Sequence, residues 1–290
     1  MCRLLGWVAR EPVTLRDVLG GEALTAFRGL ARLHADGWGI AYDGSDGVVV
    51  ERSTSRADTD PAFTAATTAR ATRAGLVHLR WATPGLPVEL RNTHPFRYGR
   101  QAFAHNGAIY PVERRDEIVS APWQDRLQGT TDSERYFLAV LAELDEPVTD
   151  VATAVSRVTG RLAREFRPSG LNALLHTPTA LYAVSCHDPA AAPSAAPPAP
   201  GSTAEIAAVD AATYFDLQYR VTPDAVVVAS SGFIPPDVDG WQPLPNDTAL
   251  VIDRTTLATR QVPLGSGLGA AWPDSAARTG WPPALSAGSN

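Results

Sequence analysis

The residue with the clearest chemical potential is Cys2, which directly follows the initiator Met1. Removal of Met1 would place a thiol and a free α-amine on one residue, and a small second residue permits that cleavage. A free α-amine has a pKa of about 7.7–8.0, so it can act as general base for the neighbouring thiol. Cys2 is therefore a candidate nucleophile with its own amine as candidate base, although many chains begin Met-Cys without any chemical consequence.

Four polar motifs follow downstream of Cys2. They are Arg80-Trp81-Ala82-Thr83, Asn92-Thr93-His94-Pro95, His105-Asn106-Gly107 and Thr131-Asp132-Ser133-Glu134. Each also has a purely structural interpretation. Arg80 could be a surface ion-pair partner, and His94 could be an ordinary loop histidine. Asn106-Gly107 could be a hairpin turn, and Asp132 could be only a helix cap. Taken singly, the motifs favour these structural interpretations.

In this order the motifs resemble the glutaminase domain of the class II glutamine amidotransferases, which are N-terminal-nucleophile hydrolases. That family has an N-terminal cysteine, then Arg-Trp-Ala-Thr, Asn-x-His-Pro, His-Asn-Gly and Thr-Asp-x-Glu, and all of these occur between residues 2 and 144. The stretch His34-Ala35-Asp36-Gly37-Trp38-Gly39-Ile40 is similar to the stand-alone YafJ-like branch. The Met-Cys-Arg start and the Asp-Gly-Trp-Gly motif are also shared with the stand-alone EgtC-like hydrolases.

The resemblance implies a four-layer αββα sandwich of two stacked, mainly antiparallel sheets, and it implies a role for each matched residue. Cys2 is expected to be the nucleophile, with its α-amine as base, and Asn106 and Gly107 to form the oxyanion hole. The residues expected to bind substrate are Arg80, Trp81, Thr83, His94 and Asp132. A planar guanidinium such as that of Arg80 suits the α-carboxylate of a glutamyl group, and Asp132 would accept the α-ammonium. No metal and no cofactor is implied.

The expected activity is hydrolysis of a γ-glutamyl amide bond, of glutamine or another γ-glutamyl compound, through a thioester on Cys2. Pro84 stands where synthase-linked members usually have histidine, which concerns the choice of substrate more than the chemistry. Nothing after residue 144 resembles a synthase, so one alternative is a glutaminase subunit that delivers ammonia to a separate acceptor synthetase. Two further alternatives are an EgtC-like γ-glutamyl hydrolase in thiol-histidine biosynthesis and, from another class, a non-catalytic regulatory or binding protein.

The composition of the 290 residues excludes other kinds of chemistry. Cys2 and Cys186 are the only cysteines, so the chain has no disulfide framework and no Cys-rich metal site. It has no lysine, which rules out a lysine Schiff base. The formal net charge is −6 and the arginines are scattered, so nothing suggests nucleic-acid binding. No apolar run reaches the roughly 20 residues of a membrane span, and we expect a cytoplasmic protein.

The elements that must position these residues follow from apolar periodicity and turn signals. Strands are predicted at 2–9, 37–44, 47–53, 76–82 and 101–109, as a pair within 171–186, and within 225–231 and 248–264. Helices are predicted at 60–74 with Pro61 in the first turn and Gly75 as the stop, at 131–144 with Thr131 or Asp132 as cap, and at 150–166. This mixed order predicts an α+β fold with antiparallel sheets. We expect one domain over 2–264, with a Pro/Ala-rich loop at 189–204, and a disordered tail at 265–290.

Overall fold

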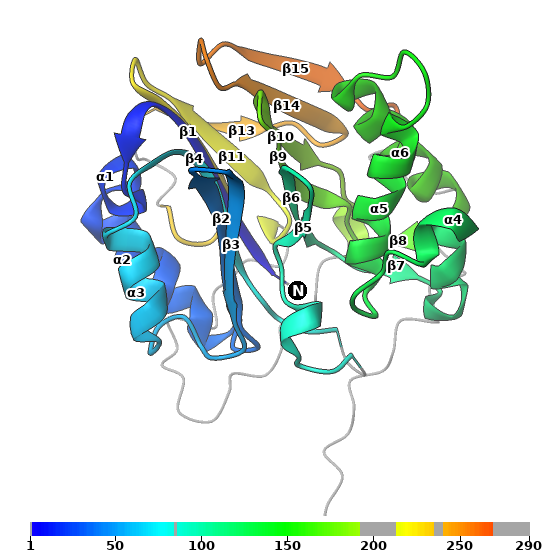
Figure 1. The fold of residues 1–290 in the computed structure, drawn as a ribbon, viewed down its shortest axis with the longest axis horizontal. Helices are drawn as coiled ribbons and strands as arrows, with labels where there is room; N and C mark the ends of the chain where they lie inside the picture. Colours follow the sequence, from blue (N-terminus) through cyan, green and yellow to red (C-terminus); the bar gives the residue numbers. More distant parts are fainter. Residues whose placement is uncertain (1, 84–85, 192–212, 235–239, 269–290) are drawn as a thin grey trace, which may run out of the picture.

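A computed structural model describes residues 2–83, 86–191, 213–234 and 240–268. In this part of the chain the strands form two large stacked sheets, with every pairing antiparallel (Figure 1). The seven-stranded sheet has the order β13 (Trp241–Leu244), β11 (Leu217–Val221), β12 (Ala225–Ser230), β1 (Arg3–Val13), β4 (Thr72–Leu79), β2 (Trp38–Gly44) and β3 (Gly47–Ser53). The six-stranded sheet has the order β15 (Thr259–Pro263), β14 (Thr248–Asp253), β10 (Ala180–Ser185), β9 (Asn172–His176), β6 (Gln101–Asn106) and β5 (Phe96–Tyr98). A short separate pair joins β7 (Ile109–Tyr110) to β8 (Arg167–Pro168).

Helices cover the outer face of each sheet (Figure 1). The seven-stranded sheet is covered by α1 (Leu15–Leu19), α2 (Gly21–Gly29) and α3 (Pro61–Thr68). The six-stranded sheet is covered by α5 (Asp132–Leu144) and α6 (Val151–Glu165), with α4 (Ala121–Gln124) beside them. Short 3₁₀ turns complete the described elements: η1 (Leu30–Arg32), η2 (Leu90–Asn92), η3 (Val112–Ile118) and η4 (Pro189–Ala191). The expected four-layer α+β sandwich is therefore confirmed.

Strand β1 lies in the middle of the sandwich and contributes to two of its cores. Its side chains alternate, as strand geometry requires. Leu4 and Val8 pack between the two sheets, whereas Leu5 and Trp7 pack under α1, α2 and α3. Because both faces are buried, the strand reads as a continuous apolar run rather than as an alternating one. This central position brings the N-terminal end of β1 to the interface of the two sheets.

The two long helices begin where the sequence predicts. Thr131 caps α5, its hydroxyl accepting from the Glu134 N–H at 3.1 Å, and Asp150 caps α6 by accepting from the Thr153 N–H at 2.9 Å. Each cap satisfies one backbone donor that the first helical turn leaves open. The apolar faces of α5 and α6 pack together on the outer face of the six-stranded sheet. The prediction of two amphipathic helices in this region is confirmed.

The helix predicted at 60–74 is too long. Helix α3 ends at Thr68, and β4 begins at Thr72, so Gly75 is a strand residue and not a helix stop. A Cβ on Gly75 would lie 2.5 Å from the Trp7 ring. Glycine is therefore required at this position because a large aromatic side chain crosses the neighbouring strand. That contact between β1 and β4 cannot be read from local helical pattern.

The segment after β15 continues along the core for several residues. Leu264 and Leu268 belong to the core under α5 and α6, and the Ser266 hydroxyl lies 3.3 Å from Cys186 Sγ. The rest of the predicted tail, 269–290, and residues 192–204 of the predicted loop lie outside the described residues. No helix in the described part of the chain is long and apolar enough to cross a membrane.

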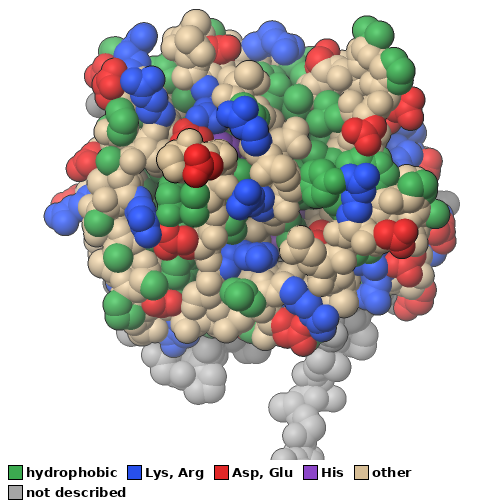
Figure 2. Space-filling model, in the orientation of Figure 1, with side chains coloured by type: hydrophobic (Ala, Val, Ile, Leu, Met, Phe, Trp, Pro, Cys, Tyr) green, Lys and Arg blue, Asp and Glu red, His purple; other side chains and the backbone are tan. Residues whose placement is uncertain are grey.

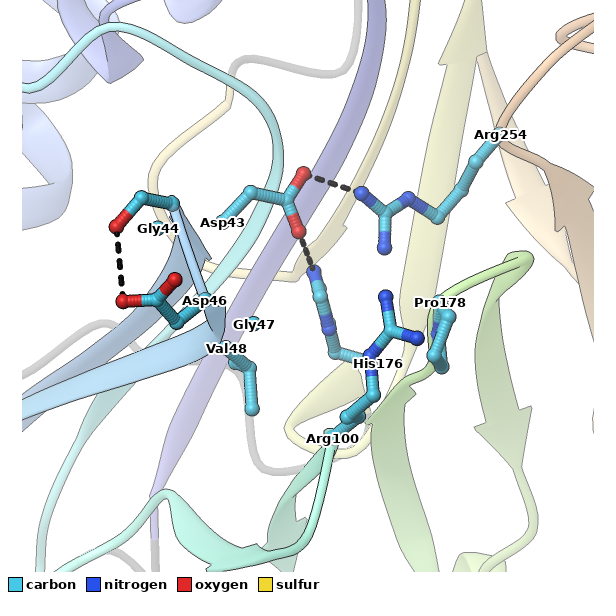
Figure 3. Close-up of a pocket in the computed structure, with 10 residues that line it drawn as sticks. Asp43, Gly44, Asp46, Gly47, Val48, Arg100, His176, Pro178 and Arg254 are labelled. Atoms are coloured by element: carbon cyan, nitrogen blue, oxygen red, sulfur yellow. Dashed lines mark hydrogen bonds and ion pairs between the residues drawn. The ribbon is translucent and has the colours of Figure 1, made fainter.

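The open edges of the two sheets meet along β3 and β5, and arginines gather down the middle of this face (Figure 2). Two hollows lie along this seam, one of about 430 Å³ beside Arg52 and Arg97 and one of about 390 Å³ beside His176. In the second hollow Asp43 lies between Arg254 and His176 and is 3.3 Å from His176 Nε2 (Figure 3). The ion pair of Asp43 with Arg254 and its contact with His176 join the end of β2 to the other sheet, at the strand ends away from Cys2.

Candidate active site

Cys2 lies at the start of β1, where the two sheets face each other. Its backbone N–H donates to Asn106 Oδ1 at 2.8 Å, a contact that joins residues 104 positions apart. Its sulfur lies 3.5 Å from the N–H of Trp81 and 3.6 Å from the carbonyl oxygen of the same residue. The thiol is thus held between the ends of β1, β4 and β6, and it is only 8 % exposed.

Asn106 carries a hydrogen-bond donor that the protein does not use. The residue ends β6 and is fully buried, and its Oδ1 is occupied by the Cys2 N–H. Its Nδ2 is buried and has no hydrogen-bond partner. A buried unsatisfied donor costs about 1–3 kcal/mol, so such groups are rare and call for an explanation. Here the unused N–H group belongs to the same amide that holds the backbone of Cys2.

Gly107 follows Asn106 in a conformation that only glycine fits. Its φ is +153°, and a Cβ would lie 1.9 Å from the carbonyl oxygen of Gly170. Strand β6 pairs with β5 and β9, whereas β7 pairs with β8. The interpretation of Asn106-Gly107 as a simple hairpin turn is therefore wrong. The pair forms the exit from β6, at the point where β6 approaches Cys2.

Arg80 is another residue of this site with a buried donor that has no partner. It follows β4 and is 3 % exposed, so the interpretation as a surface ion-pair partner is wrong. Its Nη2 donates to the carbonyl oxygen of Pro87 at 3.1 Å, whereas its Nη1 is buried without a partner. Burial lowers the pKa of Arg80, against the opposing effect of Cys2 and Asp36. A guanidinium still remains charged at any physiological pH, so this site offers a positive donor.

The segment that carries Arg80 is held in place by Asp36 and Gly37. Asp36 Oδ2 accepts from the Ala82 N–H at 2.7 Å, the Asp36 N–H donates to the Arg80 carbonyl at 3.1 Å, and the Arg80 N–H donates to Gly37 O at 2.8 Å. Gly39 lies so close to the neighbouring segment that a Cβ would be 2.1 Å from His94 O. The Asp-Gly-Trp-Gly motif thus positions the site, a role that sequence reasoning did not assign to it.

Asp132 is the first residue of α5, and Thr131 takes the role of cap. Asp132 Oδ2 accepts from the Ile109 N–H at 2.8 Å, and its Oδ1 accepts from the Ser133 N–H at 2.9 Å. Its carboxylate therefore lies against the chain that leaves Gly107, beside the exit from β6. The interpretation of Asp132 as only a helix cap does not hold, because its carboxylate also joins α5 to this segment.

The other predicted substrate residues lie around this group in different ways. Trp81 packs edge-to-face on His34 with ring centroids 5.8 Å apart. His94 is buried, and its Nδ1 lies 2.9 Å from Nε2 of His78 on β4, so its ring contacts the seven-stranded sheet. Thr83 is half-buried at the end of a described segment, and Pro84 lies outside the described residues. Trp81 is thus the one of these three whose backbone contacts the thiol.

Two buried ionic residues near the site were not expected. Arg3 is fully buried, donates to the carbonyl oxygens of Tyr214 at 3.1 Å and Cys2 at 3.4 Å, and has its pKa lowered by burial. Glu134 accepts from the N–H groups of Gln128 at 2.9 Å and Gly129 at 2.7 Å, which fixes the loop before α5. The place of Glu134 in the Thr-Asp-x-Glu motif was a sequence signal for its role, whereas the only signal for Arg3 was its place beside Cys2.

No group of three or more histidine, cysteine or acidic side chains suited to a metal ion occurs among the described residues.

Comparison with known proteins agrees with this arrangement. A family model described as class II glutamine amidotransferases matches residues 1–262. The γ-glutamyl-hercynylcysteine sulfoxide hydrolase of Mycobacterium tuberculosis is 32 % identical over 118 residues, which are 38 % of this chain and 50 % of that protein. The glutamine–fructose-6-phosphate aminotransferase of Mycolicibacterium smegmatis is 36 % identical over 175 residues, which are 57 % of this chain and 27 % of that protein. The chain spans about half the length of the first curated relatives that it matches.

Solved structures share the fold at lower sequence identity. A class II glutamine aminotransferase domain protein from Silicibacter pomeroyi has a TM-score of 0.57 at 21 % identity, over 90 % of this chain and all of that one. The glutamine phosphoribosylpyrophosphate amidotransferase of Bacillus subtilis has a TM-score of 0.58 at 15 % identity, over 91 % of this chain and 49 % of that one. With the family model covering nearly the whole chain, this protein belongs to the class II glutamine amidotransferases, a family of N-terminal-nucleophile enzymes.

Proposed function

We propose that this protein hydrolyses γ-glutamyl amide bonds through a thioester on Cys2. The observation that carries the proposal is that two of the buried donors without a partner, Asn106 Nδ2 and Arg80 Nη1, belong to the segments that contact the thiol residue. Unsatisfied buried donors cost stability, and a ligand that accepts hydrogen bonds from them removes that cost. A γ-glutamyl amide offers a reacting carbonyl oxygen and an α-carboxylate, which match the two donors in kind.

Arg80 and Asp132 would bind the amino-acid end of the substrate. A guanidinium pairs with a carboxylate through parallel N–H donors, and Arg80 has such a donor unused. Asp132 would accept the α-ammonium, since its carboxylate is oriented by two backbone N–H groups and carries further lone pairs. Binding both charged α-groups would leave the γ-amide at the thiol, and Trp81, Thr83 and His94 would shape the surroundings.

The chemistry needs Met1 to be removed. The freed amine of Cys2 would take the thiol proton, and the thiolate would attack the γ-carbonyl carbon. Asn106 Nδ2 and the Gly107 N–H would bind the oxyanion, a contribution worth about 2.7–4 kcal/mol of barrier per donor in well-studied hydrolases. The ammonium form of the amine would then protonate the leaving nitrogen, which departs as ammonia or an amine. Water, deprotonated by the same amine, would release glutamate and regenerate the thiol.

The M. tuberculosis relative bears a name that describes a γ-glutamyl compound other than glutamine as its substrate. That name supports the broader class of γ-glutamyl amides, with glutamine as one member. A glutaminase that delivers ammonia to a separate synthetase would share the same half-reaction. Cleavage of glutamine alone in the substrate panel below would favour the glutaminase, and cleavage of other γ-glutamyl amides would favour the broader hydrolase.

The test is a panel of γ-glutamyl compounds, including glutamine, offered to protein whose N-terminus has been verified by mass. We expect release of glutamate with one or more of them, and a γ-glutamyl adduct on Cys2 after rapid quenching. Arg80→Lys should lower kcat/KM by roughly tenfold to two-hundredfold, because an ammonium cannot reproduce the bidentate pairing. Full turnover by Cys2→Ala, or by protein that retains Met1, would refute the proposal.

A further inference from the structure

A hydrogen-bonded series of buried polar groups connects β6 to the carboxylate of Asp132. His105, the residue before Asn106, is 1 % exposed. Its Nε2 lies 3.0 Å from the carbonyl oxygen of Gly170, and its Nδ1 lies 2.9 Å from the Ser133 hydroxyl. The same hydroxyl lies 3.4 Å from Asp132 Oδ1. Ser133 is therefore placed between a histidine ring and the carboxylate to which we assign the α-ammonium.

The positions of the protons in this hydrogen-bonded series follow from the groups at its two ends, the Gly170 carbonyl oxygen and the Asp132 carboxylate. A carbonyl oxygen can only accept, so His105 Nε2 carries a proton and donates it to Gly170 O. In the neutral ring, Nδ1 is then an acceptor, and the single Ser133 hydroxyl proton points to His105. If His105 gains a proton, its Nδ1–H donates to Ser133 instead. The hydroxyl proton of Ser133 must then turn to its remaining neighbour, Asp132 Oδ1.

The surroundings favour the neutral form of His105. Burial lowers the pKa of His105, while Asp132 and the Gly170 carbonyl oppose that effect. From α5, the Tyr136 ring lies edge-on at 5.5 Å and is uncharged, because burial raises its pKa. From the opposite side, His94 accepts from the His105 backbone N–H at 3.4 Å and contacts His78, and burial lowers the pKa of both. Asp132 is thus the only charge among these groups.

We propose that Ser133 and His105 determine whether Asp132 is open to the substrate α-ammonium. The proposal rests on the proposed function, in which Asp132 binds that α-ammonium. With His105 neutral, the Ser133 hydroxyl points away and Asp132 Oδ1 keeps a lone pair for the ammonium. With His105 protonated, the hydroxyl donates to Oδ1 and competes with the substrate. Ser133 and His105 are positioning residues in this scheme, since neither needs to touch the substrate.

The experiment compares a γ-glutamyl anilide with its N-acetyl form between about pH 4.5 and 8. The ratio of the two kcat/KM values isolates recognition of the α-amine, because the nucleophile and its base act equally on both compounds. In the wild type this ratio should fall by about tenfold or more in acid, the worth of one charge-assisted hydrogen bond. The substrate α-ammonium keeps its charge across this range and cannot cause the fall.

Two variants and one control complete the test. Ser133→Ala should show a flat ratio, because it removes the competing hydroxyl and leaves a protonated His105 without an acceptor at Nδ1. His105→Gln should also be flat, because an amide can donate and accept but does not titrate. Ser185→Ala is the control: it removes a buried hydroxyl on β10, away from the hydrogen-bonded series of His105, Ser133 and Asp132. Its kcat/KM ratio should depend on pH as in the wild type. Thermal unfolding of each variant reports whether its fold is intact.

The possible results separate this inference from the proposed function. A flat ratio in the wild type, or an equal fall in the wild type and both variants, would overturn the roles of Ser133 and His105 and leave hydrolysis by Cys2 unaffected. Equal cleavage of the two anilides at every pH would instead refute the assignment of Asp132, and this inference with it. The proposal is supported if the kcat/KM ratio falls in acid for the wild type and for Ser185→Ala, and does not fall for Ser133→Ala and His105→Gln.

Discussion

Replacement of Asn106 by alanine should separate activity from stability. The amide makes one hydrogen bond to the Cys2 N–H at 2.8 Å and leaves its Nδ2 buried without a partner. Loss of Asn106 Oδ1 leaves the buried Cys2 N–H unpaired, which should cost about 1–3 kcal/mol of stability, while removal of the unsatisfied Nδ2 should return about 1–3 kcal/mol. These terms largely offset each other, so we expect little change in Tm. Loss of the oxyanion donor should lower kcat by about 10²–10³-fold.

Asn172 provides a matched control on the neighbouring strand. It is also fully buried and lies opposite Asn106 in the register of β6 and β9. Its amide is satisfied at both ends, by Phe215 O at 2.5 Å and by the Cys186 N–H at 2.7 Å. Asn172→Ala should therefore lose stability, because it removes two hydrogen bonds and leaves a buried N–H unpaired.

The assay is steady-state release of glutamate from a γ-glutamyl compound, together with thermal unfolding of each variant. We expect Asn106→Ala to fold like the wild type and to turn over slowly, and Asn172→Ala to show the reverse pattern. The reasoning would be refuted if Asn106→Ala kept its kcat and lost several degrees of Tm, since Asn106 would then be a structural residue. Equal losses of kcat in both variants would also contradict it.

Three further predictions concern the thiols and the close packing of the site. Intact-mass analysis of active protein should show Met1 absent, and activity that does not depend on its removal would contradict the proposed base. A thiol-alkylating reagent at pH 7–8 should label Cys2 and leave Cys186 unlabelled, because burial raises the pKa of Cys186 to about 12, and Cys186→Ser should stay active. Labelling of Cys186 in the folded protein would show that this site is open. Gly39→Ala should lower stability by about 1–3 kcal/mol, because its Cβ would lie 2.1 Å from His94 O, and an unchanged Tm would contradict the packing.

Much of the fold could be predicted because its signals are local. The caps Thr131 and Asp150 are followed by helical periodicity, and the hairpin of β2 and β3 is marked by apolar runs on either side of a glycine-rich turn. The helix over 60–74 was predicted too long for the opposite reason. Its end depends on Trp7, which lies on a different strand and requires glycine at position 75. No pattern within that segment records the contact.

The candidate site divides in the same way. The ordered motifs indicated Cys2, Arg80, Asn106 and Asp132, because their residue types suit the chemistry of a glutamyl amide. The supporting residues were harder to find. Asp36 acts through hydrogen bonds to the segment 80–82, and His105 acts through Ser133, so their roles depend on partners far away in the sequence.

The sequence by itself determined which side chains can carry the chemistry and which local segments form strands and helices, since residue type, periodicity and capping act over a few residues. Only the tertiary structure decided which donors stay unused. Asn106 Nδ2 and Arg80 Nη1 are buried without partners because the stacking of two sheets encloses them beside Cys2. Satisfaction of a hydrogen bond depends on every neighbour in space, including neighbours more than a hundred residues away, as in the contact between Cys2 and Asn106. That information exists only once the sheets have packed.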